Sequence, residues 1–300
     1  MTVSPLSTNP VTTLLNLLLP QPAVIGNPTN ADVTEDVNVS AAGQLTASGT
    51  ISISDPNLGE SYFKTGVTAA AGDLGTLTLA ANGTYTYSVS DSAVQYLGAG
   101  QTKVDTFTIY SADNTSKLIS FTIHGTNDAA VIGNPTVHDV TEDVAVVSGN
   151  LIASGTLSIS DADQGQSSFQ TTVVGATGNL GTLTLAANGS YTYSVADSAV
   201  QYLGGNDTKV DSFTVTSFDG TSKVVSFTIH GTNDAAVIGN ATVTDVTENV
   251  NVRSDGFIIT SGSISISDVD QGQAAFQAAS INPANGNLGG LLLNADGTYS

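Results

Sequence analysis

The sequence contains no cysteine and no tryptophan, and only six of its 300 residues are lysine or arginine. Without cysteine the fold cannot depend on disulfide bonds, although this absence alone does not decide the compartment. Twenty-six acidic residues give a formal net charge of −20. Nucleic acids and anionic membrane surfaces would be repelled by this charge, so we expect cations, and no nucleic acid, as partners.

Motifs that support catalysis are missing too. The sequence has no phosphate-binding loop of the form G-x-x-x-x-G-K-[ST], no triad pattern of serine, histidine and acid, and no zinc-ligand spacing. His124 and His230 follow isoleucines that are expected to face the core, so their imidazoles should point to solvent. We therefore expect a protein that is not an enzyme and has no catalytic residues.

Long apolar runs are scarce. The strongest covers residues 11–19, which is too short to span a bilayer and is not preceded by the basic residues of a signal peptide. We expect no membrane insertion, and an export signal would have to lie elsewhere.

The sequence does contain long tandem repeats. Residues 121–134 recur unchanged at residues 227–240, and residues 74–98 recur at residues 180–204 with two substitutions. A third copy begins after Asp234 and stops at Ser300 before its last strands. The predicted organisation is an N-terminal extension (1–22), two complete repeats (23–128 and 129–234) and a truncated third repeat (235–300).

Alternating apolar residues predict strands in each repeat. In the second repeat, residues 183–185 and 191–195 flank Asn188-Gly189, which predicts a β-hairpin with a type I′ turn. A second hairpin is predicted for residues 213–229 around Asp219-Gly220. Three more strands are expected near residues 140–147, 151–160 and 168–174, with a short helical turn within residues 197–203.

These signals indicate an all-β protein of tandem immunoglobulin-like β-sandwiches with about seven strands per unit. The alternating tyrosines are expected to pack in the core, as alternating aromatics commonly do: Tyr85, Tyr87, Tyr191 and Tyr193.

Carboxylates gather at the ends of the expected strands. Asp161 and Asp163 precede a glycine turn, and two carboxylates at this spacing can direct their oxygens to one hard cation. The same pattern of a starting acid, a closing Asn-Asp pair and a D-x-D pair recurs along the chain: Glu35, Asn127, Asp128, Glu142, Asn233, Asp234, Glu248, Asp268 and Asp270. Because aspartate and asparagine before glycine are also ordinary turn formers, turn chemistry without a metal is the alternative.

Several motifs in register resemble VCBS repeats: GTNDAAVIG at the repeat boundary, TEDV near the start, SISDADQGQ at a strand end, and NGxYTY in a hairpin. VCBS repeats are cadherin-like domains of large bacterial surface proteins, often RTX-type adhesins that leave the cell by type I secretion. The resemblance extends from about Ala23 onward. It implies a non-enzymatic structural or adhesive segment at the extracellular bacterial cell surface, with a role in biofilm formation and a cell-surface or matrix ligand.

The resemblance also implies calcium, because cadherins bind calcium where consecutive repeats meet. By this resemblance the first junction would use Glu35, Asn127, Asp128, Asp161 and Asp163, and the second would use Glu142, Asn233, Asp234, Asp268 and Asp270. The chain has Gly125 and Gly231 where the cadherin linker opens with aspartate, and no clear match to the cadherin L-D-R-E acids, which implies fewer or weaker ions. Asp55-Pro56-Asn57 replaces the D-x-D pair in the first repeat, so no good site is expected at its N-terminal end.

Two alternatives stay open. In the first, residues 11–19 of one molecule would add as a strand to the incomplete third repeat of another molecule, which would give a homopolymeric filament. In the second, the repeats would be accessory or carbohydrate-binding modules of a larger secreted protein.

Overall fold

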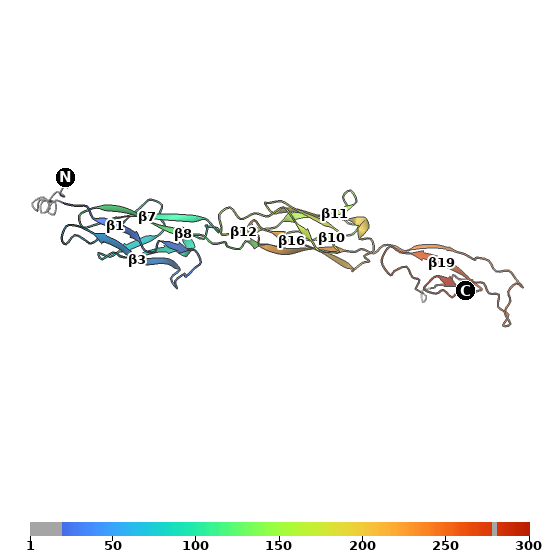
Figure 1. The fold of residues 1–300 in the computed structure, drawn as a ribbon. Coiled ribbons are helices and arrows are strands. Elements are labelled where there is room, and N and C mark those ends of the chain that lie inside the picture. Colours follow the sequence, from blue (N-terminus) through green and yellow to red (C-terminus); the bar gives the residue numbers. More distant parts are fainter. Residues whose placement is uncertain (1–19, 278–280) are drawn as a thin grey trace, which may run out of the picture. The chain divides into compact units, whose positions relative to one another are not determined.

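A computed structural model of the chain describes residues 20–277 and 281–300 (Figure 1). These residues form two compact units. Unit 1 extends to Val131 and also contains the loop Ser160–Ser167, whereas unit 2 contains Ile132–Ile159 and the described residues from Ser168 onward. The apolar segment at residues 11–19, and most of the extension predicted for residues 1–22, lie outside the described residues.

Unit 1 contains two four-stranded sheets, in the orders β1-β3-β6-β5 and β2-β8-β7-β4. β2 pairs with β8 in parallel, and the other strand pairs of these two sheets are antiparallel. The strands are β1 (Val24–Pro28), β2 (Asp32–Thr34), β3 (Gln44–Ser54), β4 (Thr68–Ala69), β5 (Thr76–Leu79), β6 (Thr84–Ser90), β7 (Thr102–Tyr110) and β8 (Ser116–His124). A short 3-10 turn, η1 (Asp91–Ala93), follows β6.

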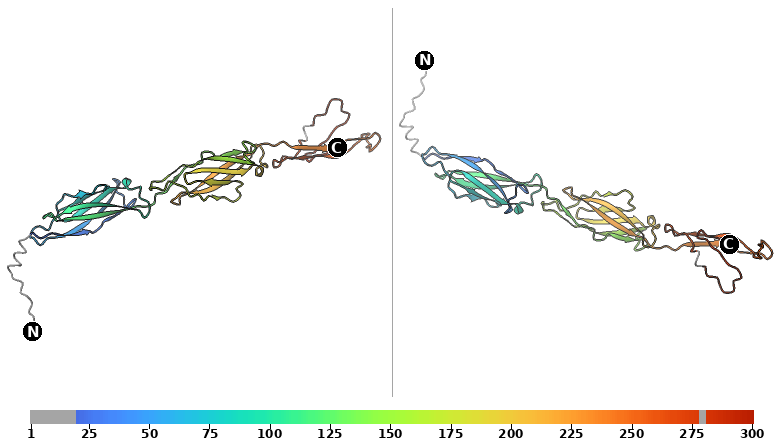
Figure 2. Two further views of the ribbon diagram at one scale, coloured as in Figure 1. Left: turned by 90° about the horizontal axis from the view of Figure 1, so that it is seen from above. Right: turned by 90° about the horizontal axis from the view of Figure 1, so that it is seen from below.

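The second repeat has sheets in the orders β10-β17-β16-β13, β11-β15-β14 and β12-β9. Its elements are β9 (Val131–Ile132), β10 (Asp139–Thr141), β11 (Asn150–Thr156), β12 (Ile159–Ser160), β13 (Val174–Gly175), β14 (Thr182–Leu185), β15 (Ser190–Ala196), η2 (Asp197–Ala199), β16 (Thr208–Thr216) and β17 (Ser222–His230). The chain after Asp234 adds the sheet β18-β19-β20, formed by β18 (Val237–Ala241), β19 (Gly262–Ser267) and β20 (Thr298–Tyr299). In the two complete repeats, the long strands run along the length of the repeat (Figure 2).

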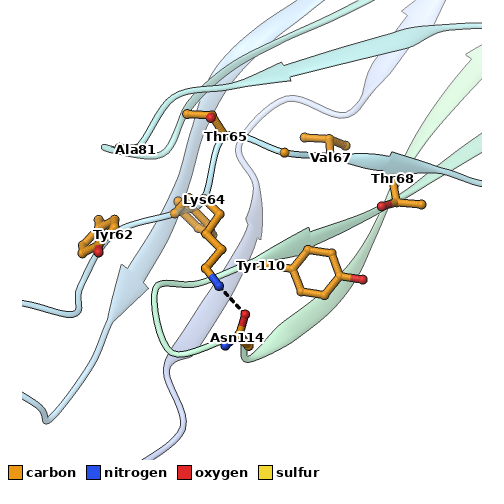
Figure 3. Close-up of a pocket in the computed structure, with 10 residues that line it drawn as sticks. Tyr62, Lys64, Thr65, Val67, Thr68, Ala81, Tyr110 and Asn114 are labelled. Carbon is orange, nitrogen blue, oxygen red and sulfur yellow. Dashed lines mark hydrogen bonds between the residues drawn. The ribbon is translucent and has the colours of Figure 1, made fainter.

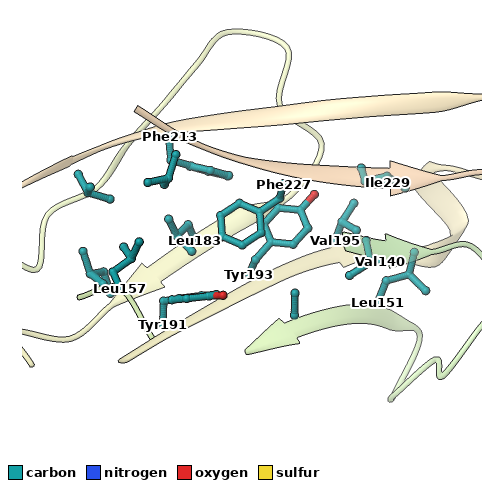
Figure 4. Packing of buried hydrophobic residues seen from close by; sticks show 14 of the residues in the cluster. Val140, Leu151, Leu157, Leu183, Tyr191, Tyr193, Val195, Phe213, Phe227 and Ile229 are labelled. Carbon is teal, nitrogen blue, oxygen red and sulfur yellow. The ribbon is translucent and has the colours of Figure 1, made fainter. Parts of the chain in front are cut away.

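Each complete repeat has its own apolar core, built from side chains that alternate along the strands. In the second repeat, Tyr193 stacks on Phe227 with ring centroids 4.5 Å apart, and Phe213 meets the same phenylalanine edge to face (Figure 4). The first repeat has the same stack, with Tyr87 on Phe121 at 4.5 Å. The prediction that the four alternating tyrosines pack in the core is confirmed, since all are at most 4% exposed.

A buried aspartate links the two sheets of each repeat. Asp211, in β16, is fully buried and accepts hydrogen bonds from the Tyr193 hydroxyl (2.9 Å) and from the backbone N–H of Leu180 and Gly181 (2.6 Å for Gly181). Asp105 has the equivalent partners in the first repeat. Burial alone would raise the pKa of Asp105, but the hydrogen bonds from Gly75 and Tyr87 outweigh it and lower the pKa.

The first strand of each repeat differs from the prediction. The sequence suggested about seven strands, whereas the first repeat has eight because its first strand is divided between the sheets: β1 pairs with β3, and β2 pairs with β8. In the second repeat, the strand expected at residues 140–147 is limited to β10. It ends there because Asp143 and Ala145 adopt φ values of +59° and +54°, which a strand cannot accommodate.

The hairpin at residues 182–196 is confirmed, but its predicted type I′ turn is wrong. That turn requires positive φ at both central residues. Gly189 has φ of +85°, whereas Asn188 does not belong to the described residues with positive φ. Gly189 N–H instead donates to the Ala186 carbonyl (2.9 Å). A Cβ at Gly189 would lie 2.2 Å from the Leu157 carbonyl oxygen, so close backbone packing also requires glycine there.

Two other local predictions, the helical turn and the exposed histidines, are confirmed. The helical turn expected within residues 197–203 is η2. His124 and His230 have side chains that are 46% and 45% exposed, while the preceding isoleucines are buried. No helix in the described part of the chain is long and apolar enough to cross a membrane.

Replacing the buried aspartate should destabilise its repeat. We expect Asp211→Ala to lower the free energy of unfolding by about 3 kcal/mol, because two backbone N–H groups and one hydroxyl lose their acceptor. Urea unfolding followed by circular dichroism measures this change. Asp245→Ala, which removes an exposed carboxylate, is the control and should change stability by less than about 0.5 kcal/mol. Equal effects of the two substitutions would contradict the role given to Asp211.

Candidate functional site

Glu35 is the buried acid at the end of the first repeat. It directly follows β2, and its backbone N–H continues the pairing with β8 by donating to the His124 carbonyl (2.9 Å). Its side chain is fully buried, and its Oε2 accepts a hydrogen bond from the backbone N–H of Thr126 (3.3 Å). The parallel pairing of β2 with β8 thus places this carboxylate where the chain leaves the first repeat.

The D-x-D pair lies in the loop Ser160–Ser167, which belongs to unit 1. Asp161 Oδ1 accepts from the Asp163 N–H at 2.9 Å, an Asx turn in which the first aspartate orders the second. Gln164 N–H donates to the Tyr96 carbonyl (3.0 Å), and Asp163 Oδ2 accepts from the Asp128 N–H (3.1 Å). The structure therefore brings the loop that contains Asp161 and Asp163 to the closing Asn-Asp segment.

Asn127 and Asp128 contribute in different ways. The Asn127 side chain is exposed and donates to the Asp128 carbonyl (2.9 Å), so it shapes the turn. Asp128 is half-buried and faces other carboxylates. Their charges, together with burial as the larger cause, raise the pKa of Asp128.

Two further acids lie at this site that the sequence analysis missed. Asp36, with φ of +60°, donates its N–H to Asp91 Oδ1 (3.0 Å), and Gln95 Nε2 donates to Asp36 Oδ1 (3.0 Å). Both aspartates contribute to the raised pKa of Asp128, which shows that they lie near it. The signal that could have revealed them is their recurrence in the second repeat as Asp143, Asp197 and Gln201.

The second repeat builds the same arrangement inside unit 2. Glu142 is fully buried and accepts from the Thr232 N–H (3.1 Å), and Asp270 accepts from the Asp234 N–H (3.0 Å). Asp268 Oδ1 orders Asp270 by accepting its N–H at 3.0 Å. Asn233 donates to the carbonyl of the next residue, as Asn127 does.

Two glycines explain why the linker differs from the cadherin pattern. A Cβ at Gly125 would lie 2.2 Å from the Leu97 carbonyl oxygen, and one at Gly231 would lie 2.4 Å from the Leu203 carbonyl oxygen. No side chain, and so no carboxylate, fits at these positions.

The electrostatics of both sites are those of crowded like charges. Burial, and then the charges of neighbouring acids that include Asp128, raise the pKa of Glu35 from 4.5 to about 7. Burial and nearby aspartates also raise the pKa of Glu142 and of Asp234. A carboxylate in such surroundings is stabilised by a proton or by a bound cation.

Unsatisfied oxygens show what these sites could hold. Within the described residues, buried carboxylate oxygens without a hydrogen-bond partner occur at both sites: Glu35 Oε1, Asp128 Oδ2, Asp161 Oδ2, Glu142 Oε1, Asp234 Oδ2 and Asp270 Oδ1. Carboxylate oxygen is the preferred ligand of calcium. The same part of the chain contains no group of three or more His, Cys, Asp or Glu side chains that could hold a metal ion. The acids at these sites are therefore neighbours, but they do not surround a common point. In chemical type, these carboxylate oxygens are donors that suit calcium.

Two other predicted positions lie apart from these sites. Glu248, the starting acid of the third copy, is exposed. In the first repeat, Asn57 stands in for the second aspartate of the D-x-D pair, and its Oδ1 accepts from the Gln21 N–H (2.8 Å). The prediction of no good site there stays a prediction.

Paired sheets with acids at the repeat ends define a class, that of cadherin-like β-sandwich repeats. The family described as bacterial cadherin-like domain matches residues 127–231, which confirms the cadherin-like resemblance for the second repeat. No curated protein matches the chain.

Solved structures of cadherins are similar to the chain at low identity. A structure of protocadherin gamma B2 extracellular cadherin domains 1–5 is 12% identical with a TM-score of 0.45, covering 89% of this chain and 50% of that one. A protocadherin gamma B7 EC3–6 structure is 12% identical with a TM-score of 0.44, covering 91% and 65%. Drosophila N-cadherin EC1–4 is 11% identical with a TM-score of 0.31, covering 93% and 66%. The chain thus spans about two thirds or less of these proteins' lengths, and its fold class rests on the strand pairing described above.

Glu35 should make the calcium-free protein less stable as pH rises. Its pKa is about 7 in the folded state and 4.5 ordinarily, so between these values the folded state holds a proton that the unfolded state does not. Stability should therefore fall by up to about 3 kcal/mol from pH 4.5 to pH 7.5. Urea unfolding in EGTA at a series of pH values measures this slope.

The control for this experiment is Glu35→Gln, which keeps an acceptor for Thr126 and cannot ionise. We expect it to reduce the pH dependence and to raise stability at pH 7.5, while Glu142, whose pKa is also raised, keeps its own contribution. A wild-type chain that becomes more stable over the same interval would show that Glu35 is not held in its neutral form.

Proposed function

We propose that the chain is a non-enzymatic structural segment of an extracellular bacterial surface adhesin, in which calcium at the end of each repeat fixes the next repeat in place. The observation that carries this proposal is the fully buried Glu35, whose Oε1 has no partner within the described residues. Burying a carboxylate without compensation costs several kcal/mol, so a folded protein retains it where a cation compensates.

The residues that would hold the ion come from three places. Glu35 follows β2, Asp128 closes the repeat, and Asp161 with Asp163 lies in the next loop. These four carboxylates carry four negative charges, which two calcium ions would neutralise. Asp36 and Asp91 supply further charge beside them. The second repeat would use four equivalent carboxylates, those of Glu142, Asp234, Asp268 and Asp270. In each repeat, the turn shaped by Asn127 or Asn233 would position the aspartate that follows it.

The chemistry that calcium supplies is a multidentate link between segments that otherwise repel. The Asp128 backbone N–H already donates one hydrogen bond to the Asp163 carboxylate, which is too little to oppose like charge at close range. A bound cation would reverse the sign of this interaction. Extracellular calcium modules bind with dissociation constants of about 0.1–1 mM, so the sites would fill outside the cell and stay empty inside it.

This assignment extends the match of residues 127–231 to bacterial cadherin-like domains. The bacterial cell surface, biofilm formation and type I secretion follow from the resemblance of the motifs. Adhesion would then belong to a surface or matrix ligand, for which the repeats act mainly as a spacer.

Calcium should extend and stiffen the chain. We expect small-angle scattering to give a larger maximum dimension at about 2 mM calcium than in about 5 mM EGTA, and unfolding to require about 1–2 kcal/mol more. Asp161→Ala with Asp163→Ala should remove the response of the first site and leave that of Asp268 and Asp270. Identical scattering curves and equal stability in both buffers would refute the proposal.

Matched controls separate ligand loss from charge loss. Asp245→Ala with Glu248→Ala also removes two acids, but both are exposed. This double variant should keep the calcium response of the unsubstituted chain. Isothermal titration should lose the ions of one site in the Asp161 and Asp163 variant and none in the control.

Filament assembly is favoured by one observation only. The chain after residue 245 has a largely apolar cleft of about 620 Å³, lined by side chains that include Phe257 and Leu292, which are 67% and 64% exposed. An added strand could cover such side chains. Deletion of residues 1–20 should abolish any concentration-dependent polymer seen by light scattering, whereas a monomer at all concentrations would exclude this alternative.

A further inference from the structure

Basic residues are so few that each can be traced to its partner. Five of the six contact an acid or the backbone. Lys103 and Lys209 lie beside Asp105 and Asp211, and Arg253 pairs with Asp255. Lys117 and Lys223 donate to backbone carbonyls at the first strand of their repeats. Lys64 is different. The corresponding residue of the second repeat is Gln170.

Lys64 has a neutral partner only. Its ammonium donates to Asn114 Oδ1, and within the described residues no carboxylate oxygen lies within 4.0 Å of it. In a chain with 26 acidic residues this is an unusual position for a lysine. Because an ammonium group has three donors, at least one N–H remains for a further acceptor.

The Lys64 ammonium lies in an open cleft of about 780 Å³ on unit 1. In the view of Figure 3, the lysine side chain lies between Tyr62 and Tyr110 and extends toward Asn114. Thr65 and Thr68 add hydroxyl groups to the lining, and the volume lies in the range of small-molecule sites.

The backbone around the cleft is fixed. Lys64 N–H donates to the Tyr110 carbonyl (2.9 Å), and Ala112 N–H donates to the Tyr62 carbonyl (3.0 Å), so the loop is joined to the end of β7. Asn114 adopts φ of +70° in the turn between β7 and β8. The side chains therefore stand on a rigid frame, which is what a preformed binding site requires.

The second repeat has the same frame with different side chains. Gln170 N–H donates to the Thr216 carbonyl (2.9 Å), and Phe218 N–H donates to the Ser168 carbonyl (2.8 Å). In the second repeat, Ser168 and Thr216 replace the two tyrosines, Gln170 replaces the lysine, and Gly220 replaces the asparagine. Because the second repeat folds in the same way without them, the fold does not require these four side chains.

We propose that this cleft binds a carboxylated saccharide, such as a uronic acid unit of an anionic glycan, with Lys64 on the carboxylate. An ammonium without an acidic partner attracts an anion, and charge-assisted hydrogen bonds are the strongest that such a side chain forms. Tyr62, 47% exposed, and Tyr110 offer apolar ring faces with polar ends, to which a pyranose ring is matched. Asn114 and the threonines supply partners for sugar hydroxyls.

The shape of the cleft favours a glycan over a peptide. A peptide ligand is commonly anchored by a large side chain in a deep, desolvated pocket. Phe63, which also lines this open cleft, is only 1% exposed, and other apolar side chains of the lining, such as Val67 and Ala81, are short. Asp113, the acid next to Asn114 in the chain, accepts hydrogen bonds from the Ser111 and Thr115 hydroxyls. Exposed charges farther away than about 8 Å are screened at physiological ionic strength.

The test is isothermal titration of the full 300-residue chain with trigalacturonate and, separately, with neutral galactotriose. Performing it in EGTA excludes binding through calcium, so that failure here is distinct from failure of the calcium proposal. We expect one trigalacturonate per chain, weaker binding at high salt, and affinity for galactotriose at least about tenfold lower. No binding of trigalacturonate, or equal affinity for both sugars, would overturn the proposal.

Variants locate the site by exchanging residues between repeats. Lys64→Gln and Tyr110→Thr introduce the residues of the second repeat, and each should weaken trigalacturonate binding at least about tenfold. Lys64→Arg should retain binding, and Arg253→Gln, which removes the same charge elsewhere, should leave it unchanged. Equal losses from Arg253→Gln and Lys64→Gln would show that net charge, and not this cleft, binds the sugar.

A transplant provides the gain of function. Ser168→Tyr, Gln170→Lys, Thr216→Tyr and Gly220→Asn together would place the four side chains on the frame of the second repeat. A Cβ at Gly220 would meet no atom within 4 Å, and its φ of +95° would have to shift toward the +70° of Asn114. A stoichiometry of two trigalacturonates per chain would support the proposal. A correctly folded transplant that still binds only one would contradict the assignment of these residues.

Discussion

Glu35 and Glu142 are fully buried carboxylates, and each has one oxygen bonded to a backbone N–H and one without a partner in the described residues. The ends of both repeats are arranged around these groups. The parallel pairing of β2 with β8 delivers the glutamate, and Gly125 lets the chain pass close to Leu97. Such a carboxylate is costly to ionise alone, so the stability of this region depends on whether a proton or a cation accompanies it.

The same chemical group serves a different purpose in the core. Asp105 is as buried as Glu35, yet its two oxygens accept bonds from Gly75, Leu74 and Tyr87. Its pKa is lowered, whereas that of Glu35 is raised to about 7. Both are fully buried, so the two cases differ in the donors around Asp105, which include the Lys103 ammonium, and in the acidic neighbours of Glu35. One acid completes the fold by itself, and the other leaves an oxygen for a partner from outside.

The strands and their hairpins could be predicted because period-two alternation is a local property of the sequence, as at residues 213–229. The turn at Gly189 could not, since Gly189 packs against the Leu157 carbonyl of the segment between β11 and β12, far away in the sequence. At the candidate site, the motif resemblance identified Glu35 and Asp163 as candidate ligands, but it did not identify the neighbouring acids Asp36 and Asp91. Asp36 lies in the TEDV motif directly after Glu35, but the resemblance assigns it no role. Asp91 belongs to a separate segment that only the fold brings to Asp36.

Comparison of the two complete repeats separates what the fold needs from what it leaves free. Both repeats keep the sheet-linking aspartate, the buried glutamate and the close-packed linker glycine, at Asp105 and Asp211, Glu35 and Glu142, and Gly125 and Gly231. Both also keep the backbone frame beside the end of β7 and of β16, while the side chains on it differ. A β-sandwich constrained in its core and at its ends can therefore vary its side surface while it keeps its fold. In a tandem array, this freedom allows one repeat to carry a binding cleft while its neighbour serves only as a spacer.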